Sequence, residues 1–429
     1  MLPARPFSLQ IGGGLPHAAG WTDDKPGVGA GPEGRGNGGA RMTAGRGSIL
    51  IDARVNALPG AHGLARSVTQ LAAHAGPDGH EGTDSGAGVR LQVLVNPQRP
   101  QLFPLAGLAR HAEIIGTDIT LGAVHRSRQL ARLIRRTGAS VLYAPYPLFS
   151  PLLCPCPLVV TIHDCTMEND AGFAGGRLRQ AGLKVVTRAV LRRAAAVTTP
   201  TQASLAEIRF HYPAARHLTL VPNGVDQQPY ARVSDYAVAA ARRQYRLPRR
   251  YVLAVGAHRP HKNHEILLRA LASLPADVSL VIVGPADPRF ASGVPAQIGK
   301  LGLCGRVLLL PEVADGLLPA VYRAAAVVAL PSLAEGYGLP ALEAMAAGVP
   351  VVVSDIPVLA EVCGRAAALV PPRDPAAWAA AIMKILDDPG AADRMVRAGA
   401  AIAAQATWDR GGRALRELLL SVAAAATCS

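Results

Sequence analysis

The sequence predicts an α/β protein made of two domains, each a doubly wound parallel sheet covered by helices. Three observations favour this fold class. Short apolar runs alternate with helical patterns along most of the chain, as they do in parallel sheets. The chain has 429 residues and half of them are apolar, which is enough for two separate cores. A polar, arginine-rich stretch at 229–249 divides the pattern into two series, and we expect it to be a linker.

The linker and the composition divide the chain into five segments. Residues 1–47 contain thirteen glycines and five prolines with almost no periodicity. We expect a disordered extension there, with Met42 as an alternative start of translation. The other expected segments are a first domain at 48–228, the linker at 229–249, a second domain at 250–407, and an amphipathic final helix with a tail at 408–429.

The first domain is expected to begin with a buried strand at 48–52. A glycine-containing loop through Gly60 and Gly63 follows, and a helix is expected from Leu64 onward. A second glycine-rich stretch at 76–88 is typical of a surface loop. The remaining predicted strands are 89–95, 140–143, 158–162 and 195–198, and the predicted helices are 126–137, 177–194 and 202–210.

The second domain is expected to open with a strand at 251–255. A loop with Arg259 and Lys262 follows, and the side chain of Asn263 is predicted to cap the next helix. The pair Asp374-Pro375 is typical of a cap and first turn of a later helix. The other predicted strands are 278–283, 306–310, 327–330 and 351–353. Two later helices are predicted to span about 375–404, and a last helix is predicted at 408–422.

The most informative stretch runs from Pro331 to Ser354. A glycine loop and one short helix lie between two predicted strands, with Pro340 in the first helical turn and Gly348 just after the last. Glycines allow a backbone to approach a ligand closely. Because the N–H groups of such a loop and helix start attract anions, the segment predicts a phosphate site.

Two glutamates lie on either side of this predicted phosphate site. Glu335 precedes the helix and Glu343 lies one turn inside it, so their side chains cannot share a helix face. Carboxylates accept hydrogen bonds from hydroxyl groups, and a nucleotide-sugar has hydroxyls on both sides of its diphosphate. We therefore expect Glu335 to hold the sugar and Glu343 the ribose. The alternative is an ordinary turn between strands with two surface glutamates.

The two glutamates, eight positions apart with Gly-Tyr-Gly-Leu-Pro between them, resemble the signature of family 4 (group 1) retaining glycosyltransferases of the GT-B fold. The resemblance covers residues 48–422. It implies two Rossmann-like domains that face each other across a cleft, with the acceptor on the first domain and the donor on the second. It also implies that the last helix returns to the first domain.

The same resemblance implies roles for individual residues. A His-Asp pair follows the predicted strand at 158–162, where the family has such a pair facing the sugar. The implied catalytic residues are Glu335, His163, Arg259 and Lys262. The implied donor-binding residues are Gly256, Val313, Gly336, Tyr337, Gly338, Leu339 and Glu343, and the acceptor side includes Gly63 and Asp164.

No metal ion and no cofactor are expected, since the nucleotide-sugar is a substrate. Arg259 and Lys262 supply a guanidinium fork and an ammonium that suit a leaving diphosphate. The sequence lacks an Asp-x-Asp triplet, and Glu168-Asn-Asp170 is a poor substitute. Zinc at Cys154-Pro-Cys156 is disfavoured because the motif lacks the usual spacing of metal-binding cysteines.

Charge and cysteine content narrow the range of partners. The net charge of +14 suits nucleic acid, an anionic membrane or anionic substrates, but the scattered arginines argue against nucleic acid. The six cysteines form no disulfide framework. No secretory signal or membrane-spanning run is visible, which predicts a cytoplasmic protein with peripheral contact to the inner face of an anionic membrane.

The sequence therefore predicts a hexosyltransferase that moves a sugar from a nucleotide-sugar to a glycan or a lipid-linked glycan, with retention of configuration. The resemblance includes mannosyltransferase-like enzymes of glycan and polysaccharide biosynthesis. A nucleotide-sugar epimerase or hydrolase of the same architecture, and a non-catalytic nucleotide-sugar sensor, are the alternatives. The sequence leaves the sugar, the base, the acceptor and the oligomeric state open.

Overall fold

The computed structural model describes residues 48–58, 62–76, 90–99, 102–103, 108, 112–121, 126–149, 153–287, 290 and 293–427. The predicted extension at 1–47, Gly60, most of the glycine-rich stretch at 76–88 and Cys428 lie outside these ranges. Every described residue belongs to one compact unit, Gly45–Ser429.

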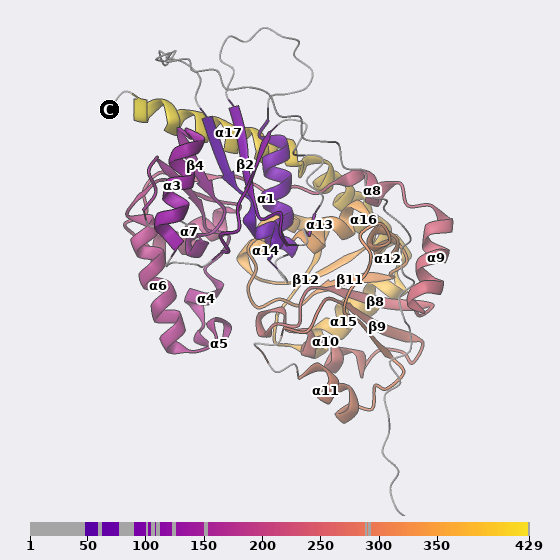
Figure 1. Ribbon diagram of the computed structural model, residues 1–429. Coiled ribbons are helices and arrows are strands. Elements are labelled where there is room, and N and C mark those ends of the chain that lie inside the picture. The colour runs from indigo at the N-terminus through magenta and orange to yellow at the C-terminus, as the bar shows by residue number, and fades with distance from the viewer. Residues whose placement is uncertain are drawn as a thin grey trace, which may run out of the picture. The chain divides into compact units, whose positions relative to one another are not determined.

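The first domain contains a seven-stranded sheet in which all neighbouring strands are parallel, in the order β3-β2-β1-β4-β5-β6-β7. Figure 1 shows its strands in indigo and purple, with helices packed around them. The strands are β1 (Ser48–Asp52), β2 (Arg90–Val95), β3 (Glu113–Gly116), β4 (Val141–Ala144), β5 (Leu158–Thr161), β6 (Ala194–Thr199) and β7 (Leu218–Leu220). Five of them confirm predicted strands, whereas β3 and β7 were not predicted as strands.

The helices predicted for the first domain are confirmed to within three residues at each end. The described helices are α1 (His62–His74), α3 (Ser127–Thr137), α4 (Thr166–Asn169), α5 (Ala171–Ala174), α6 (Arg177–Leu191) and α7 (Gln202–His211), with 3-10 turns at Arg54–Ala57 and Pro147–Phe149. α7 begins where the Thr201 side chain accepts a hydrogen bond from the Ser204 amide.

The second domain contains a six-stranded parallel sheet in the order β10-β9-β8-β11-β12-β13. The strands are β8 (Arg250–Val255), β9 (Val278–Val283), β10 (Val307–Leu310), β11 (Val327–Leu330), β12 (Val351–Ser354) and β13 (Ala368–Val370). Its helices are α10 (His264–Leu271), α11 (Val294–Lys300), α12 (Leu318–Arg323), α13 (Leu339–Ala346), α14 (Pro357–Cys363), α15 (Pro375–Asp387) and α16 (Pro389–Gln405), with 3-10 turns at Pro260–Lys262 and Gly364–Ala366.

Helices cover both faces of the second sheet, as the apolar strands require. In β8, Tyr251 and Leu253 are buried in the cluster that includes α12 and α13, whereas Val252 and Ala254 are buried in the cluster that includes α10 and α15. Successive side chains of a strand point to opposite faces, so a strand with two buried faces is apolar throughout.

The stretch that we expect to be a linker is helical over most of its length. Residues 229–249 fall largely into α8 (Gln227–Ala231) and α9 (Asp235–Tyr245). Tyr230 and Ala241 from these helices are buried in the core cluster of the second domain. Asp235, Arg243 and Gln244 are exposed, whereas the half-buried Arg242 donates to the carbonyls of Pro248 and Ala324.

The final helix α17 (Trp408–Thr427) packs against the first domain, as the resemblance implied. Trp408, Leu415, Leu419 and Ala423 are buried in the core cluster of the first domain. Figure 1 shows this yellow helix running beside α1 and the first sheet.

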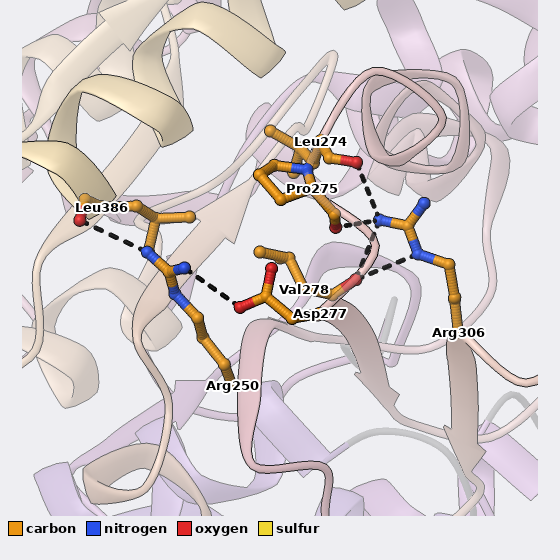
Figure 2. A network of polar contacts seen from close by, with 7 residues as sticks. All are labelled: Arg250, Leu274, Pro275, Asp277, Val278, Arg306 and Leu386. Atoms are coloured by element: carbon orange, nitrogen blue, oxygen red, sulfur yellow. Dashed lines mark hydrogen bonds and ion pairs between the residues drawn. The ribbon is translucent and has the colours of Figure 1, made fainter.

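Two arginines stabilise the amino-terminal edge of the second sheet (Figure 2). Arg306 donates to the carbonyl oxygens of Leu274, Pro275 and Val278, at distances from 2.7 to 3.1 Å. Arg250 donates to Asp277 at 3.2 Å, and to the carbonyl of Leu386. Some of the arginines that give the chain its positive net charge therefore donate hydrogen bonds to backbone carbonyls.

Both sheets reverse their strand order beside the first strand of the domain. β1 lies between β2 and β4, and β8 lies between β9 and β11. Ligands of open parallel sheets bind beyond the carboxyl ends of the strands at such a reversal. The loops after β8 and β11 carry most of the predicted donor-site residues.

Candidate functional site

The segment Pro331–Ser354 has the structure that the sequence predicts, with a loop after β11, then α13 and β12. Pro340 lies in the first turn of α13, and Gly348 follows the helix with a φ of 68°. Gly338 has a φ of 91°, and a Cβ there would lie 2.6 Å from Cδ2 of Leu359. This position therefore needs glycine.

Glu335 is paired with Lys262, which comes from the loop after β8. The Lys262 nitrogen lies 2.6 Å from Oε1 of Glu335, and the Ser332 hydroxyl donates to the same oxygen at 2.6 Å. Burial alone would raise the pKa of Glu335, but Lys262 and Ser332 outweigh it and hold that pKa below its ordinary value. Gly256 has a φ of 150°, and a Cβ there would be in ordinary contact with the Lys262 side chain at 3.5 Å.

Arg259, the second member of the predicted basic pair, binds a different carboxylate. Its Nε donates to Asp287 at 2.9 Å, in the loop after β9. The structure therefore brings Lys262 and Glu335 together and links Arg259 to Asp287. Sequence reasoning missed Asp287, whose only sequence signal is its place after a buried strand and a glycine.

Asn263 does not cap α10 with its side chain, so this prediction was wrong. Asn263 has a φ of 53° and its side-chain amide donates to the carbonyls of Pro331 and Pro372, at 3.0 and 2.8 Å. The bond to Pro331 connects the loop after β8 to the start of the Glu335 loop, and the bond to Pro372 connects it to the segment after β13. Asn263 thus fixes the spacing of the Lys262–Glu335 pair.

Glu343 is 5% exposed and binds groups from both domains. The Tyr322 hydroxyl donates to Oε2 at 2.6 Å, and Arg66 of α1 donates to Oε1. The Arg66 guanidinium carbon also lies 5.4 Å from the centre of the Phe103 ring. Burial and the nearby Glu343 carboxylate raise the pKa of Tyr230, which borders the same cluster.

His163 and Asp164 lie against the glycine loop. A Cβ on Gly336 would lie 3.0 Å from the His163 carbonyl oxygen and 3.1 Å from a carboxylate oxygen of Asp164. Burial lowers the pKa of His163, which favours the neutral ring. The ring donates from Nε2 to the Pro145 carbonyl at 3.0 Å. Asp164 accepts a hydrogen bond from the Thr166 amide at 2.9 Å.

The remaining predicted site residues are spread over several environments. Gly63 lies in the first turn of α1 and is exposed, so its prediction as a loop residue was wrong. Val313 is buried in the core of the second domain. Tyr337 donates its hydroxyl to the Asn223 carbonyl at 2.7 Å, and Leu339 packs against the core of the first domain.

A cavity of about 170 Å³ adjoins Glu343 and Arg66. Its other lining residues are Gln70, Phe103, Gly224, Val225, Asp226, Pro229, Tyr230, Asp315, Pro319, Leu339 and Trp408. They come from both domains and from the segments that connect them. The cavity lies on the Glu343 side of the glycine loop.

Within the described part of the chain, no group of three or more His, Cys, Asp or Glu side chains is arranged to hold a metal ion. The sulfur atoms of Cys154 and Cys156 lie 3.8 Å apart, and both residues are half-buried. The absence of a metal requirement stays a prediction.

Comparisons with known proteins agree with this geometry. The family model described as "Glycosyl transferases group 1" matches residues 239–401, and the "Glycosyl transferase 4-like domain" matches residues 58–224. A curated D-inositol 3-phosphate glycosyltransferase from Salinispora arenicola is 33% identical, over 64% of this chain and 67% of its own length. The chain belongs to the group 1 glycosyltransferases.

Other curated relatives of this chain are also named D-inositol 3-phosphate glycosyltransferase. The protein from Salinispora tropica is 33% identical over 64% of this chain, and that from Mycolicibacterium smegmatis is 35% identical over 59%. The chain spans 62%, 59% and 60% of the length of the first three curated relatives it matches.

Solved structures confirm the two-domain GT-B fold of the glycosyltransferase. Sucrose-phosphate synthase from Thermosynechococcus elongatus matches with a TM-score of 0.71 at 22% identity, covering 89% of this chain and all of that one. Anabaena Alr3699/HepE in complex with UDP-glucose matches with a TM-score of 0.69 at 21% identity, covering 87% and 99%.

Proposed function

We propose that the protein transfers a sugar from a nucleotide-sugar to an acceptor hydroxyl, with retention of configuration and without a metal ion. The observation that carries the proposal is the Lys262–Glu335 pair, which joins the ends of β8 and β11 beside the glycine loop at 336–338. Membership of the group 1 glycosyltransferases supports it. Glu335 would hold the sugar and Glu343 the ribose.

In this reaction the bond between the anomeric carbon and a diphosphate oxygen breaks, and its electron pair stays on that oxygen. An ammonium has three N–H donors, so Lys262 can bind Glu335 and the departing diphosphate together. The acceptor oxygen bonds to the anomeric carbon on the same face. Its proton passes to the departing phosphate oxygen, which balances the step.

The neutral state of His163 suits a position beside the sugar. Because burial lowers its pKa, the ring adds no positive charge next to an anomeric carbon that itself becomes positive. Its backbone lies against Gly336, so the His163–Asp164 turn and the glycine loop enclose one side of the proposed sugar site. Asp164 and the first domain would face the acceptor.

The relatives suggest which compounds to test first. HepE was crystallised with UDP-glucose, and the curated relatives are named for D-inositol 3-phosphate. A phosphorylated acceptor is consistent with the net charge of +14. Glycans and lipid-linked glycans are the second group of acceptors to test.

We also propose peripheral contact between α6 and an anionic membrane at the cytoplasmic face. No helix in the described part of the chain is long and apolar enough to cross a bilayer. α6 has Leu178 at 92% and Val185 at 63% exposure, with Arg179, Lys184 and Arg188 on the same helix. Exposed apolar groups flanked by basic ones favour an anionic membrane surface.

Sedimentation with anionic vesicles tests this membrane contact. Wild type is expected to bind at low salt and to be released at high salt, because salt screens the basic residues. Leu178→Glu should reduce binding, and Tyr236→Glu, at another exposed site, should not. Equal binding of all three proteins, or none even at low salt, would contradict the proposal.

Product analysis tests the enzymatic proposal. The full chain is incubated with a panel of nucleotide-sugars, with and without acceptors, and both the released nucleoside diphosphate and the new glycoside are measured. We expect a new glycoside only when acceptor is present, with the donor's anomeric configuration. An epimerase would change the donor without acceptor, a hydrolase would release free sugar, and a sensor would bind the donor without turnover.

A further inference from the structure

Arg66 and Glu343 form an ion pair between the two sheet domains. The two residues lie 277 positions apart, Arg66 on α1 of the first domain and Glu343 on α13 of the second. Arg66 donates from Nη1 to Oε1 of Glu343. No part of the proposed chemistry uses Arg66.

The pair has the geometry of an orienting contact. Tyr322 donates to Oε2 of Glu343 at 2.6 Å while Arg66 donates to Oε1, and the Tyr230 hydroxyl lies beside both Arg66 and Glu343. A carboxylate has about four acceptor positions, so one remains for a ribose hydroxyl even when Tyr230 also donates. The bonds from Tyr322 and Arg66 fix the plane of the carboxylate, and they fix the direction of the remaining position with it.

Burial makes the Arg66 contact energetically important. Glu343 is 5% exposed, and a buried carboxylate without a cationic partner is costly. The charge that neutralises it comes from the other domain. The Phe103 ring, 5.4 Å from the guanidinium carbon, further restricts where Arg66 can lie.

We propose that Arg66 is a positioning residue for the donor nucleoside. It orients the Glu343 carboxylate for the ribose, so that this end of the donor site is complete only when α1 lies against α13. This inference rests on the proposed function, because it assigns the ribose to Glu343. It adds that the first domain contributes to nucleoside affinity as well as to acceptor binding.

The first test compares Arg66→Met, Arg66→Lys and wild type by calorimetric titration with UDP and other nucleoside diphosphates. Arg66→Met keeps the bulk but removes the charge, and is expected to weaken binding about tenfold, or about 1.4 kcal/mol. Arg66→Lys keeps the charge and should recover much of the loss. Arg413→Met, at an exposed arginine of α17, is the matched control and should bind as wild type does.

Kinetics separate positioning from general damage to the fold. Arg66→Met should raise the donor KM about tenfold and change kcat less than about threefold, because ribose contacts differ little between ground and transition states. A fall in kcat with an unchanged KM would overturn the proposal. If Arg66→Met does not fold, as judged by circular dichroism, Arg66→Lys and Arg66→Gln provide the same comparison.

A double-mutant cycle tests whether Arg66 acts through Glu343. In the Glu343→Gln background, Arg66→Met should have little further effect on nucleoside diphosphate affinity. Additive losses would show that Arg66 acts elsewhere and would overturn the inference. If wild type binds no nucleoside diphosphate, the proposed function fails as well; if wild type binds and Arg66→Met binds equally, only the inference fails.

Discussion

Glu335 and Glu343 are buried carboxylates on one short segment, yet they are neutralised from different sides. The cation beside Glu335 is Lys262, which belongs to the same domain, and Ser332 and Asn263 hold that arrangement in place. The cation beside Glu343 is Arg66, which belongs to the other domain. The end of the site that we assign to the sugar is therefore assembled within one domain, and the end that we assign to the ribose requires both.

This difference between the two glutamates separates the groups that we assign to bond cleavage from those that we assign to nucleoside binding. Groups that act on the departing diphosphate need a fixed geometry at the moment of bond cleavage, and a single folded domain supplies it. A site that binds the nucleoside can include groups from a second domain. The affinity for the donor then depends on the contact between the two domains. The predictions below change one end at a time.

The largest effect is expected from Lys262→Ala. Loss of the ammonium beside a desolvated diphosphate should cost about 2–4 kcal/mol of transition-state stabilisation, or on the order of a hundredfold or more in kcat/KM. Steady-state kinetics measure the loss, with Lys300→Ala on α11 as the exposed control. A folded Lys262→Ala enzyme within a few-fold of wild type would rule out the assignment.

The Lys262 end should also be sensitive to acid. Burial, followed by the neighbouring His258, Lys262 and His261, lowers the pKa of His264 from its ordinary value of 6.5 to about 3. The unfolded chain then binds more protons than the folded one, so the free energy of unfolding falls as pH drops below about 6.5. At about pH 5, His264 alone should lower the free energy of unfolding by about 2 kcal/mol.

Urea titrations at several pH values measure this loss. His264→Gln should flatten the dependence of the free energy of unfolding on pH between about 6.5 and 4, because glutamine does not titrate. Phe210→Gln, at an exposed position without a titrating group, should leave the slope as it is in wild type. An unchanged slope in His264→Gln would contradict a buried neutral imidazole.

Replacing each of the two glutamates by glutamine should affect different kinetic constants, kcat in one case and KM in the other. Glu335→Gln removes charge beside the reacting sugar and should lower kcat about tenfold or more, with nucleoside diphosphate affinity nearly unchanged. Glu343→Gln should raise the donor KM about tenfold and weaken nucleoside diphosphate binding with it. Titration of both variants with nucleoside diphosphate measures the two affinities. If Glu335→Gln loses this affinity and Glu343→Gln keeps it, the donor lies in the opposite orientation, with the ribose at Glu335.

The smallest effect is expected from metal removal. Because we propose that Lys262 serves as the cation beside the diphosphate, activity should survive an excess of chelator. The assay compares turnover before and after chelation and after adding back magnesium or manganese. Complete loss that either metal restores would mean that Lys262 is not the stabilising group.

Features that depend on neighbours in sequence were predicted well. The strand, glycine loop, helix and strand around Glu335 and Glu343 are confirmed because Pro340, Gly348 and the apolar runs fix them locally. Three short strands, β3, β7 and β13, were not predicted as strands. In four or fewer half-buried residues, such as Glu113–Gly116, the period of two is too brief to detect.

Features that depend on distant partners were not predicted. Asn263 has the residue type of a helix cap, but two carbonyls far along the chain use its amide instead. The same holds for Asp287 beside Arg259, and for Arg66 beside Glu343 across 277 positions. Side-chain type restricts what a residue can bind, whereas only the fold decides which partner reaches it.

The return of α17 to the first domain has a consequence for synthesis on the ribosome. Trp408, Leu415 and Leu419 complete a core whose other buried members, apart from Ala423, lie between Ile49 and Val221. Translation runs from the amino terminus, so the whole second domain emerges before these side chains are available. Until then α1 and β1 have an uncovered apolar surface, and the domain translated first is the one completed last.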